Sequence, residues 1–572
     1  MSVRMQILPV VLFLAVLRPE GSLQGQNIAG LKEEKPFSIS GTLGGSMMFY
    51  DVSGRPASRK PFVWMLTGSP TVSVYGIRFP FSFVMSKEQR DFRQPFNKFG
   101  VSPYYKWVKL HLGYRNINWS PYSMAGHTIF GAGAELTPGR FQFGFLYGRL
   151  LKAIEPDALT YDLNQSFVST PAYERKALAA KFGYGTEKNN AALIFMKGWD
   201  DPGSLRSDSL RSDLLPAENV ILTFLTHQQI WSHFNFDLQL SQSLYTNDIN
   251  SGVPDSASHG LVDIFSGIYT GNATTYTSNA LETTFGYSGQ QLSVNIRFKQ
   301  IDPGYRSMGA YFFQNDIRNI TFEPALHFGK QKYNVSGSIG FQRDNLQNDL
   351  PSTTHRTIGS LSFTASPSQV YNANITWSNY DMGQSRGSTP VDSLYEISQT
   401  TQNLAVNQNL NFTGTSFSHL VMLTYNFQRL KDKNENTADM NSYNSSTLMA
   451  NYMISVMDAG LALSLGYNYT LFNLQTSENR ISGPSFSVTK SLLKKKLSLM
   501  MADHYFRNAL TFSNGTNDRI SGINRISFSG TLKPSKHHRF YVRIYINQAK
   551  AKTSNFNPFT ERKGDIGYVY SF

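Results

Sequence analysis

Strict two-residue alternation of apolar and polar residues, repeated in many segments, constrains this chain more than any other feature. In residues 291–299, Leu, Val, Ile and Phe take every second position, and Gln, Ser, Asn, Arg and Lys lie between them. Residues 234–241, 461–469 and 539–546 show the same pattern. Successive side chains of a β-strand point to opposite faces, so each segment predicts a strand with one apolar and one polar face.

A soluble β-sandwich also alternates, but two features favour a barrel in lipid. The apolar faces end in Tyr, Phe or Trp, and the polar faces carry charges such as Arg297 and Lys299 in mid-strand. Charged residues make up only 16% of the chain, against roughly 25% in soluble domains. Aromatic residues reach 13%, although the mean hydropathy is −0.31. A barrel with apolar residues outside and polar residues inside has this composition.

The connections between the predicted strands alternate between short turns and long polar segments. Outer-membrane barrels have short periplasmic turns and longer external loops. Counting these connections gives about twenty strands after residue 141 and four before it, so we predict an all-β, single antiparallel transmembrane barrel of about 24 strands, within a range of roughly 20–26. The four upstream strands are predicted at 37–50, 71–85, 104–114 and 127–136. Residues 62–66 are either a further strand or a loop tip, and 86–102 is a long connection that is a candidate for folding into the lumen.

The first residues have the pattern of a signal peptide. Arg4 precedes an apolar run at 7–17, and small residues follow at Gly21, Ser22 and Gly25. The run is shorter than the roughly 20 residues that a membrane-spanning helix needs. We therefore predict a cleaved signal peptide at 1–25, a short periplasmic segment at 26–36 and the barrel at 37–572.

The absence of cysteine excludes disulfides, thiolate metal sites and a cysteine nucleophile. The net charge of +14 is spread along the chain rather than gathered in a domain or tail, so no nucleic-acid partner is expected. Outer-membrane lipid and lipopolysaccharide are the expected surroundings of an exported barrel. No catalytic, cofactor or metal-binding residues are predicted, because the one nucleophile-elbow pattern, at 383–387, lacks a following helix. An enzyme is therefore not expected.

The last eight residues carry the only motif with a known meaning. Asp565, Gly567, Tyr570 and Phe572 occupy the defined positions of a pattern that resembles the C-terminal signature of bacterial outer-membrane proteins. The resemblance implies that this segment is the last strand of the barrel and that the barrel-assembly machinery recognises it by strand addition. The Tyr- and Asn-rich composition is also similar to that of barrels from Bacteroidota.

Five basic residues are predicted to line the lumen. Charged lumen walls favour ions of the opposite sign, so an anion-preferring path is one hypothesis. The alternative is that these residues pair with inward acids such as Asp237 or hold loops that fold inward. The five residues are Lys109, Arg297, Lys299, Arg539 and Arg543.

Two functions are compatible with a barrel of this size. An open pore of more than about 22 strands would leak, so the long loops, residues 86–102, or a plug or accessory protein must fill it. The first hypothesis is a porin-like transport or secretion conduit with a gated or occluded lumen. The alternative is a non-conducting structural barrel, acting as scaffold, adhesin or assembly partner, with functional extracellular loops.

Overall fold

The computed structural model describes most of the predicted barrel. The described residues are 35–86, 98–155, 171–205, 214–252, 269, 271–310, 314–388, 396–513, 515, 518–551, 553 and 557–572. The predicted signal peptide, all but the last two residues of the predicted periplasmic segment, and residues 87–97 lie outside them.

Strands make up nearly all of the regular structure. The helical elements among the described residues are one 3-10 turn, η3 (Pro202–Ser204), and one short helix, α3 (Ala438–Asn441). No helix in this part of the chain is long and apolar enough to cross a membrane. The strands before residue 235 are β1 (Phe37–Ser40), β2 (Thr42–Ser53), β3 (Phe62–Gly68), β4 (Thr71–Val74), β5 (Ile77–Ser86), β6 (Lys98–Val101), β7 (Tyr104–Tyr105), β8 (Val108–Asn116), β9 (Thr128–Leu136), β10 (Phe141–Leu151), β11 (Glu174–Gly185), β12 (Asn189–Asp201), β13 (Glu218–Ile230) and β14 (Phe234–Thr246).

The remaining strands include the longest of the molecule. They are β15 (Thr275–Ser288), β16 (Leu292–Ile301), β17 (Ile317–Phe328), β18 (Tyr333–Arg343), β19 (Ser352–Ala365), β20 (Tyr371–Arg386), β21 (Ser398–Thr413), β22 (Phe417–Asp432), β23 (Tyr443–Val456), β24 (Leu461–Leu474), β25 (Ser477–Leu492), β26 (Leu497–Phe512), β27 (Arg519–Leu532), β28 (His538–Ala551) and β29 (Phe559–Ser571).

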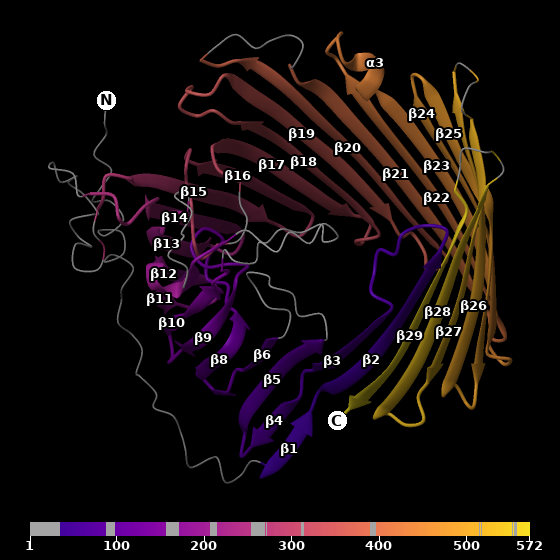
Figure 1. The fold of residues 1–572 in the computed structure, drawn as a ribbon, viewed down its shortest axis with the longest axis horizontal. Coiled ribbons are helices and arrows are strands. Elements are labelled where there is room, and N and C mark those ends of the chain that lie inside the picture. Colours follow the sequence, from indigo (N-terminus) through magenta and orange to yellow (C-terminus); the bar gives the residue numbers. More distant parts are fainter. Residues whose placement is uncertain are drawn as a thin grey trace.

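The strands form one closed antiparallel barrel. Each strand from β8 to β28 pairs with the next, and β29 pairs with β2, from Thr42 opposite Ser571 to Ser53 opposite Thr560. Three pairs of short segments, β1 with β2, β3 with β4, and β6 with β7, each continue one strand across a short break. The barrel therefore has 26 strand positions. Figure 1 shows this closure, with yellow β29 beside indigo β2.

The predicted fold class is confirmed, and the two additional strands lie where the strand prediction was weakest. Residues 62–66 belong to β3. The segment predicted as one strand at 71–85 contains β4 and β5, joined by a turn in which Tyr75 and Gly76 have φ values of 46° and 78°. The turn between β7 and β8 also contains a positive φ, 49° at Lys106. A two-residue hairpin turn leaves alternation almost unbroken, so the sequence pattern hides it.

The long connection predicted at 86–102 ends in a strand. Residues 98–101 form β6, which pairs with β5 through Phe83 opposite Phe99. Because β5 starts at the short turn after β4, its far end lies at the same end of the barrel as the long loops. Ser86 and Lys98, the described residues on either side of this connection, therefore both lie at the long-loop end of the barrel.

The two faces of the wall differ as the alternation predicts. Large apolar side chains stand exposed on one face, such as Phe145, Ile296 and Leu465, which are 51%, 48% and 61% exposed. Residues paired across antiparallel strands share a face, so the register carries this assignment from strand to strand. We call this the outer face. The other face, which the connections at 117–127 and 302–310 contact, is the inner face that lines the lumen.

Candidate functional site

The connection between β8 and β9 folds into the lumen and forms its first insert, residues 117–127. The insert is closed on itself, because Met124 N donates to Ser120 O at 3.0 Å and Trp119 N donates to Met124 O at 2.9 Å. The Trp119 indole donates to Glu135 of β9 at 2.9 Å. Its ring lies over Gly144 of β10, where an added Cβ would be 2.5 Å from the ring. A glycine is therefore required on the wall for this ring to dock.

Tyr122 anchors the tip of the first insert against β15 and β16. It is 1% exposed, and its hydroxyl donates to the Glu282 carboxylate of β15. The ammonium of Lys299, on β16, lies 5.6 Å from the centre of the Tyr122 ring. Burial and the adjacent Glu282 carboxylate raise the pKa of the Tyr122 phenol, so it remains a hydrogen-bond donor. The insert thus covers the inner face of one side of the barrel, from β9 to β16.

A second insert, residues 302–310, follows β16 and packs on the first. Tyr305 donates to the Tyr122 carbonyl at 3.1 Å, and Ala125 N donates to Gly309 O at 3.0 Å. Met308 lies over Gly198 of β12, where an added Cβ would be 2.8 Å from the Met308 side chain. The two inserts therefore form one unit.

Beneath these inserts the inner face is buried, and its apolar side chains lie beside hydrogen-bonded polar ones such as Asn219, Thr223 and Ser241. Small side chains such as Ala177 and Ala179, both 0% exposed, alternate with larger ones to receive the inserts. Two clusters of buried side chains result, one around Met124 and Met308 and one around Tyr122 and Tyr305. We call this side of the barrel, from β9 to β15, the filled side. Its buried inner-face residues include Ile129, Leu146, Leu150, Ala177, Ala179, Ile194, Met196 and Ile221.

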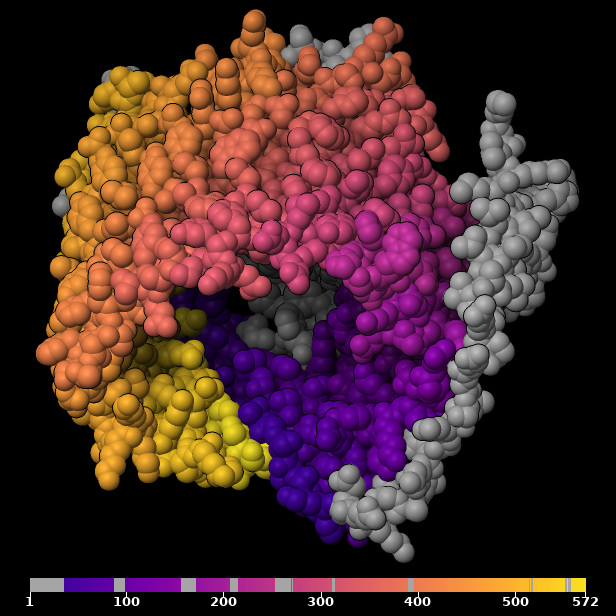
Figure 2. All heavy atoms as spheres, turned by 180° about the vertical axis from the view of Figure 1, so that it is seen from behind, coloured from indigo at the N-terminus to yellow at the C-terminus, as the bar shows by residue number. Residues whose placement is uncertain are grey.

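The opposite side, β20 to β25, has a different inner face, and we call it the open side. Away from the strand ends, the register assigns no charged residue to its lumen face. Asparagine, serine and threonine side chains bond to one another there: Asn407 with Thr424 at 3.0 Å, and Asn451 with Ser464 at 3.0 Å. Figure 2 shows the centre of the molecule hollowed. Other inner-face residues of this side are Asn374, Thr376, Ser378, Asn403, Asn426, Thr447, Asn468, Ser485 and Ser487.

Four of the five predicted basic residues contact carboxylates or aromatic rings. Lys109 lies 3.3 Å from Glu135, Arg297 lies 4.0 Å from Glu282 and 3.7 Å from Glu323, and Arg543 lies 3.6 Å from Asp565. Lys299 lies over Tyr122, as described above. Arg539 stands opposite Val569 on β29 and has no ion pair within the described residues. The basic residues therefore lie on β8, β16 and β28, outside both the filled and the open side, and do not form one ring.

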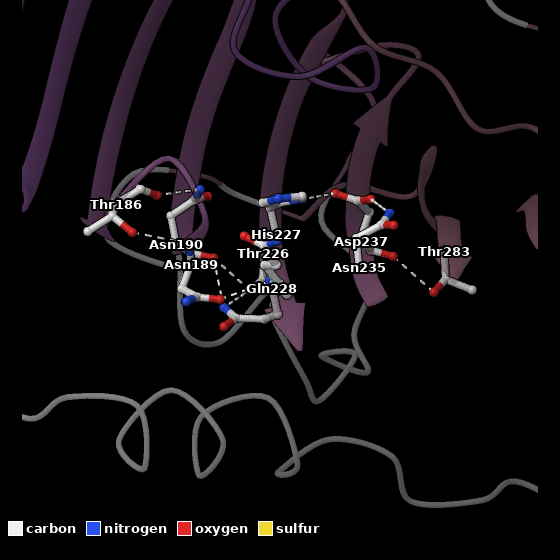
Figure 3. A network of polar contacts seen from close by, with 10 residues as sticks. Thr186, Asn189, Asn190, Thr226, His227, Gln228, Asn235, Asp237 and Thr283 are labelled. Carbon is white, nitrogen blue, oxygen red and sulfur yellow. Dashed lines mark hydrogen bonds and ion pairs between the residues drawn. The ribbon is translucent and has the colours of Figure 1, made fainter. Parts of the chain in front are cut away.

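Asp237, the acid proposed as a partner for these residues, pairs with a histidine instead. Its Oδ1 lies 2.6 Å from His227 Nδ1, and Asn235 Nδ2 donates to its Oδ2 at 3.4 Å. Figure 3 shows this pair within a network that links neighbouring strands near the short turns. In the same network Thr226 donates to the Asn190 carbonyl at 2.7 Å. The network ties β12 to β15 together and supplies no cluster of metal ligands; no such cluster occurs among the described residues.

The C-terminal signature residues lie at the seam that closes the barrel. Gly567 lies under the Tyr541 ring of β28, where an added Cβ would be 2.2 Å from the ring. The Tyr570 and Phe572 rings meet edge to face at 4.9 Å. Asp565 takes part in the ion pair with Arg543. These contacts give each position of the pattern a packing role within the folded barrel.

No protein-family model matches the sequence, and no curated protein matches it significantly. Among solved structures, the chain is similar to OccAB4 of Acinetobacter baumannii, with 10% identity over 70% of this chain and 99% of that one, at a TM-score of 0.30. It is also similar to the FrpB iron transporter of Neisseria meningitidis (F5-1 variant), with 9% identity over 95% and 83% of the two chains, at 0.39. An E. coli P pilus tip assembly intermediate, PapC-PapD-PapK-PapG, gives 12% identity over 93% and 61%, at 0.42. All three scores lie below 0.5, and the barrel is defined by the strand pairings of this chain.

Proposed function

We propose that this protein is an outer-membrane barrel of a Gram-negative bacterium, and that it is a transport or secretion conduit whose lumen the described residues fill on one side and not on the other. The exposed apolar outer face supports the membrane location, since a soluble protein would have to cover it. A closed barrel leaves no unpaired edge, which is what a strand-built membrane protein needs. Because outer-membrane barrels have short periplasmic turns and longer external loops, the short turns of this barrel would face the periplasm and its long loops the cell exterior.

The observation that carries the proposal is the difference between the two sides of the lumen. The inserts at 117–127 and 302–310 close the filled side with a dry core. The open side presents amide and hydroxyl groups that solvate a hydrophilic cargo without holding it by charge. Such a wall suits passage better than tight binding, because conduction requires that cargo also leaves.

The remaining expectations from sequence are part of the same proposal. Export through a signal peptide at 1–25 would bring the chain to the barrel-assembly machinery, which would recognise Asp565, Gly567, Tyr570 and Phe572. A plug or accessory protein would occupy the open side when no cargo passes. Edman sequencing of the mature protein would test the first step, with Gln26 expected as its first residue.

Planar-bilayer recording of the purified, refolded protein tests the conduit. We expect stable conductance, and a larger conductance from a variant in which residues 118–125 are replaced by a short glycine-serine linker. The same recording under a salt gradient measures anion preference. A cation-selective current would refute the hypothesis that Lys109, Arg297, Lys299, Arg539 and Arg543 favour anions. Silence from both proteins, with folding verified by heat-modifiable electrophoretic mobility, would favour the alternative of a non-conducting barrel with functional loops.

A further inference from the structure

A row of polar side chains, three of them basic, runs along adjacent strands near the long-loop end, on the face away from the lumen. Arg318 of β17 stands directly opposite Gln300 of β16 on one side and Arg343 of β18 on the other. Arg343 in turn stands opposite His355 of β19. Four consecutive strands therefore contribute one residue each to a single row.

The row lies on the outer face, at the upper edge of the apolar surface. Ile317, next to Arg318, is 6% exposed and packs in the lumen cluster with Tyr122, so Arg318 points the other way. The next pair along the same face is Ile320 opposite Phe341, and these side chains are 48% and 56% exposed. A lipid that covers Ile320 and Phe341 would therefore carry its headgroup at the level of Arg318 and Arg343.

The two guanidinium groups lack the carboxylate partner that some cations near the long-loop end have. Arg562 lies 2.7 Å from Asp51, and Lys433 lies 2.7 Å from Asp381. Within the described part of the chain neither Arg318 nor Arg343 has an ion-pair partner. Like charges directly opposite each other on a sheet are destabilising, so this pair costs stability unless an anion lies between them.

One nearby carboxylate, Asp302, contacts the row through Gln300, and two others are engaged elsewhere. Asp316 accepts hydrogen bonds from the backbone N–H groups of Asn345 and Leu346, at 3.0 and 2.8 Å. Asp344 accepts from Thr354 N at 2.6 Å. These bonds hold the two acids in the loop turns beside the row rather than over it.

A side-chain hydrogen bond holds Arg318, whereas Arg343 leaves a donor unused. Arg318 Nε donates to Gln300 Oε1 at 2.9 Å, and Gln300 Nε2 donates to Asp302 Oδ1 at 3.2 Å. Arg343 Nε is buried and has no hydrogen-bond partner within the described residues. Two guanidinium groups side by side match the oxygens of a phosphate, which arginine binds through paired N–H donors.

We propose that Gln300, Arg318, Arg343 and His355 form a binding site for the phosphate of an outer-leaflet lipid, the phosphorylated lipid A part of lipopolysaccharide. Its acyl chains lie along the apolar surface that includes Ile320, Ile339 and Phe341. The phosphate oxygens accept hydrogen bonds from both guanidinium groups and remove the repulsion between them. The site rests on the outer-membrane location proposed above, but it does not depend on whether the lumen conducts.

Native mass spectrometry of the full-length mature protein in detergent tests the site. The protein is titrated with diphosphorylated lipid A, dephosphorylated lipid A, phosphatidylethanolamine and inorganic phosphate. We expect diphosphorylated lipid A to bind roughly tenfold or more tightly than the other three, because charge-assisted hydrogen bonds are lost with the phosphate or with the acyl chains. The double variant R318Q/R343Q should lose this preference, and the matched control R562Q, whose cation already pairs with Asp51, should keep it.

A second measurement separates loss of binding from loss of folding. Thermal unfolding of R318Q/R343Q without lipid should occur at the wild-type temperature or above it, because a like-charge pair has been removed. Diphosphorylated lipid A should raise the unfolding temperature of the wild type and R562Q but not that of the double variant. Equal affinity for the phosphorylated and dephosphorylated lipids, equal affinity of wild type and double variant, or capture of inorganic phosphate as tightly as lipid would each overturn the site. Conductance of the double variant should equal that of the wild type, so failure of the conduit and failure of this site are distinguishable.

Discussion

The filled side and the open side of this barrel are built from the same kind of antiparallel strand, yet the burial of their inner-face residues differs. On the filled side Ala177, Ala179 and Ile221 are completely buried under the two inserts. On the open side Ala405 is only partly buried and lies between Thr376 and Asn426 on the lumen wall. Both sides present similar exposed apolar residues to the outside.

The difference shows that the residue types of the outer face and those of the inner face are determined separately, by the surroundings outside the barrel and by the segments that fill it. In the proposed membrane setting, lipid favours one apolar pattern over the whole outer face. The inner face is densely packed where a described chain segment covers it, and there the wall also supplies glycines under the incoming side chains, as Gly144 does for Trp119 and Gly198 for Met308. The filled side therefore resembles a small globular core set into the barrel wall.

The largest difference in stability is expected when an aspartate is introduced on the inner face of each side. Ala179→Asp buries a carboxylate in the dry core and should destabilise the barrel by about 3 kcal/mol or more, because burial without a partner disfavours the charge. Ala405→Asp should fold with wild-type stability and shift the conductance toward cations. Urea unfolding in vesicles and reversal potentials measure the two effects. Equal losses of stability would show that the two sides do not differ in hydration.

Removal of the tip of the first insert should have the next largest effect. Tyr122→Ala empties a fully buried position and removes the donor to Glu282, so we expect a loss of about 3 kcal/mol. Tyr380→Ala on the open side is the matched control and should change stability by less than about 1 kcal/mol. The insert would not be a packed part of the wall if both variants unfolded at the wild-type urea concentration.

A comparison of two glycine substitutions should give the smallest effect on stability. Gly144→Leu forces a side chain into the place of the Trp119 ring and should cost about 1–3 kcal/mol. It should also raise the conductance, since a displaced insert widens the lumen. Gly383→Leu, at a position where an added Cβ meets nothing within 4 Å, should alter neither property. A neutral Gly144→Leu would mean that Trp119 does not dock there.

Much of the fold was predictable from sequence because alternation is a local signal. The faces of β14, β16, β24 and β28 follow directly from their residues, and Arg297 falls on the face that alternation assigned to it. The two missed strands were hidden by two-residue turns such as Tyr75 and Gly76, which barely interrupt the pattern. The observed 26 strands are two more than the central prediction and lie within its range.

The inserts could not be predicted in the same way, because their contacts are distant in sequence. Tyr122 meets Glu282, 160 positions further along the chain, and nothing local to either residue indicates the other. One signal was present: the connection at 117–127 contains Ile117, Trp119, Tyr122 and Met124. So many large apolar side chains are unusual in a solvated loop and suggest a segment that packs.

Labelling of single cysteines tests the central claim most directly, since the chain has no cysteine of its own. Ala405→Cys, Ala179→Cys and Leu465→Cys place one thiol on the open inner face, in the dry core and on the outer face. In lipid vesicles, a hydrophilic maleimide should react rapidly at position 405 and hardly at all at 179 and 465, while every site should react after unfolding. Rapid labelling at 465 would contradict a lipid-facing outer surface, and equal labelling at 179 and 405 would contradict a lumen that is dry on one side and wet on the other.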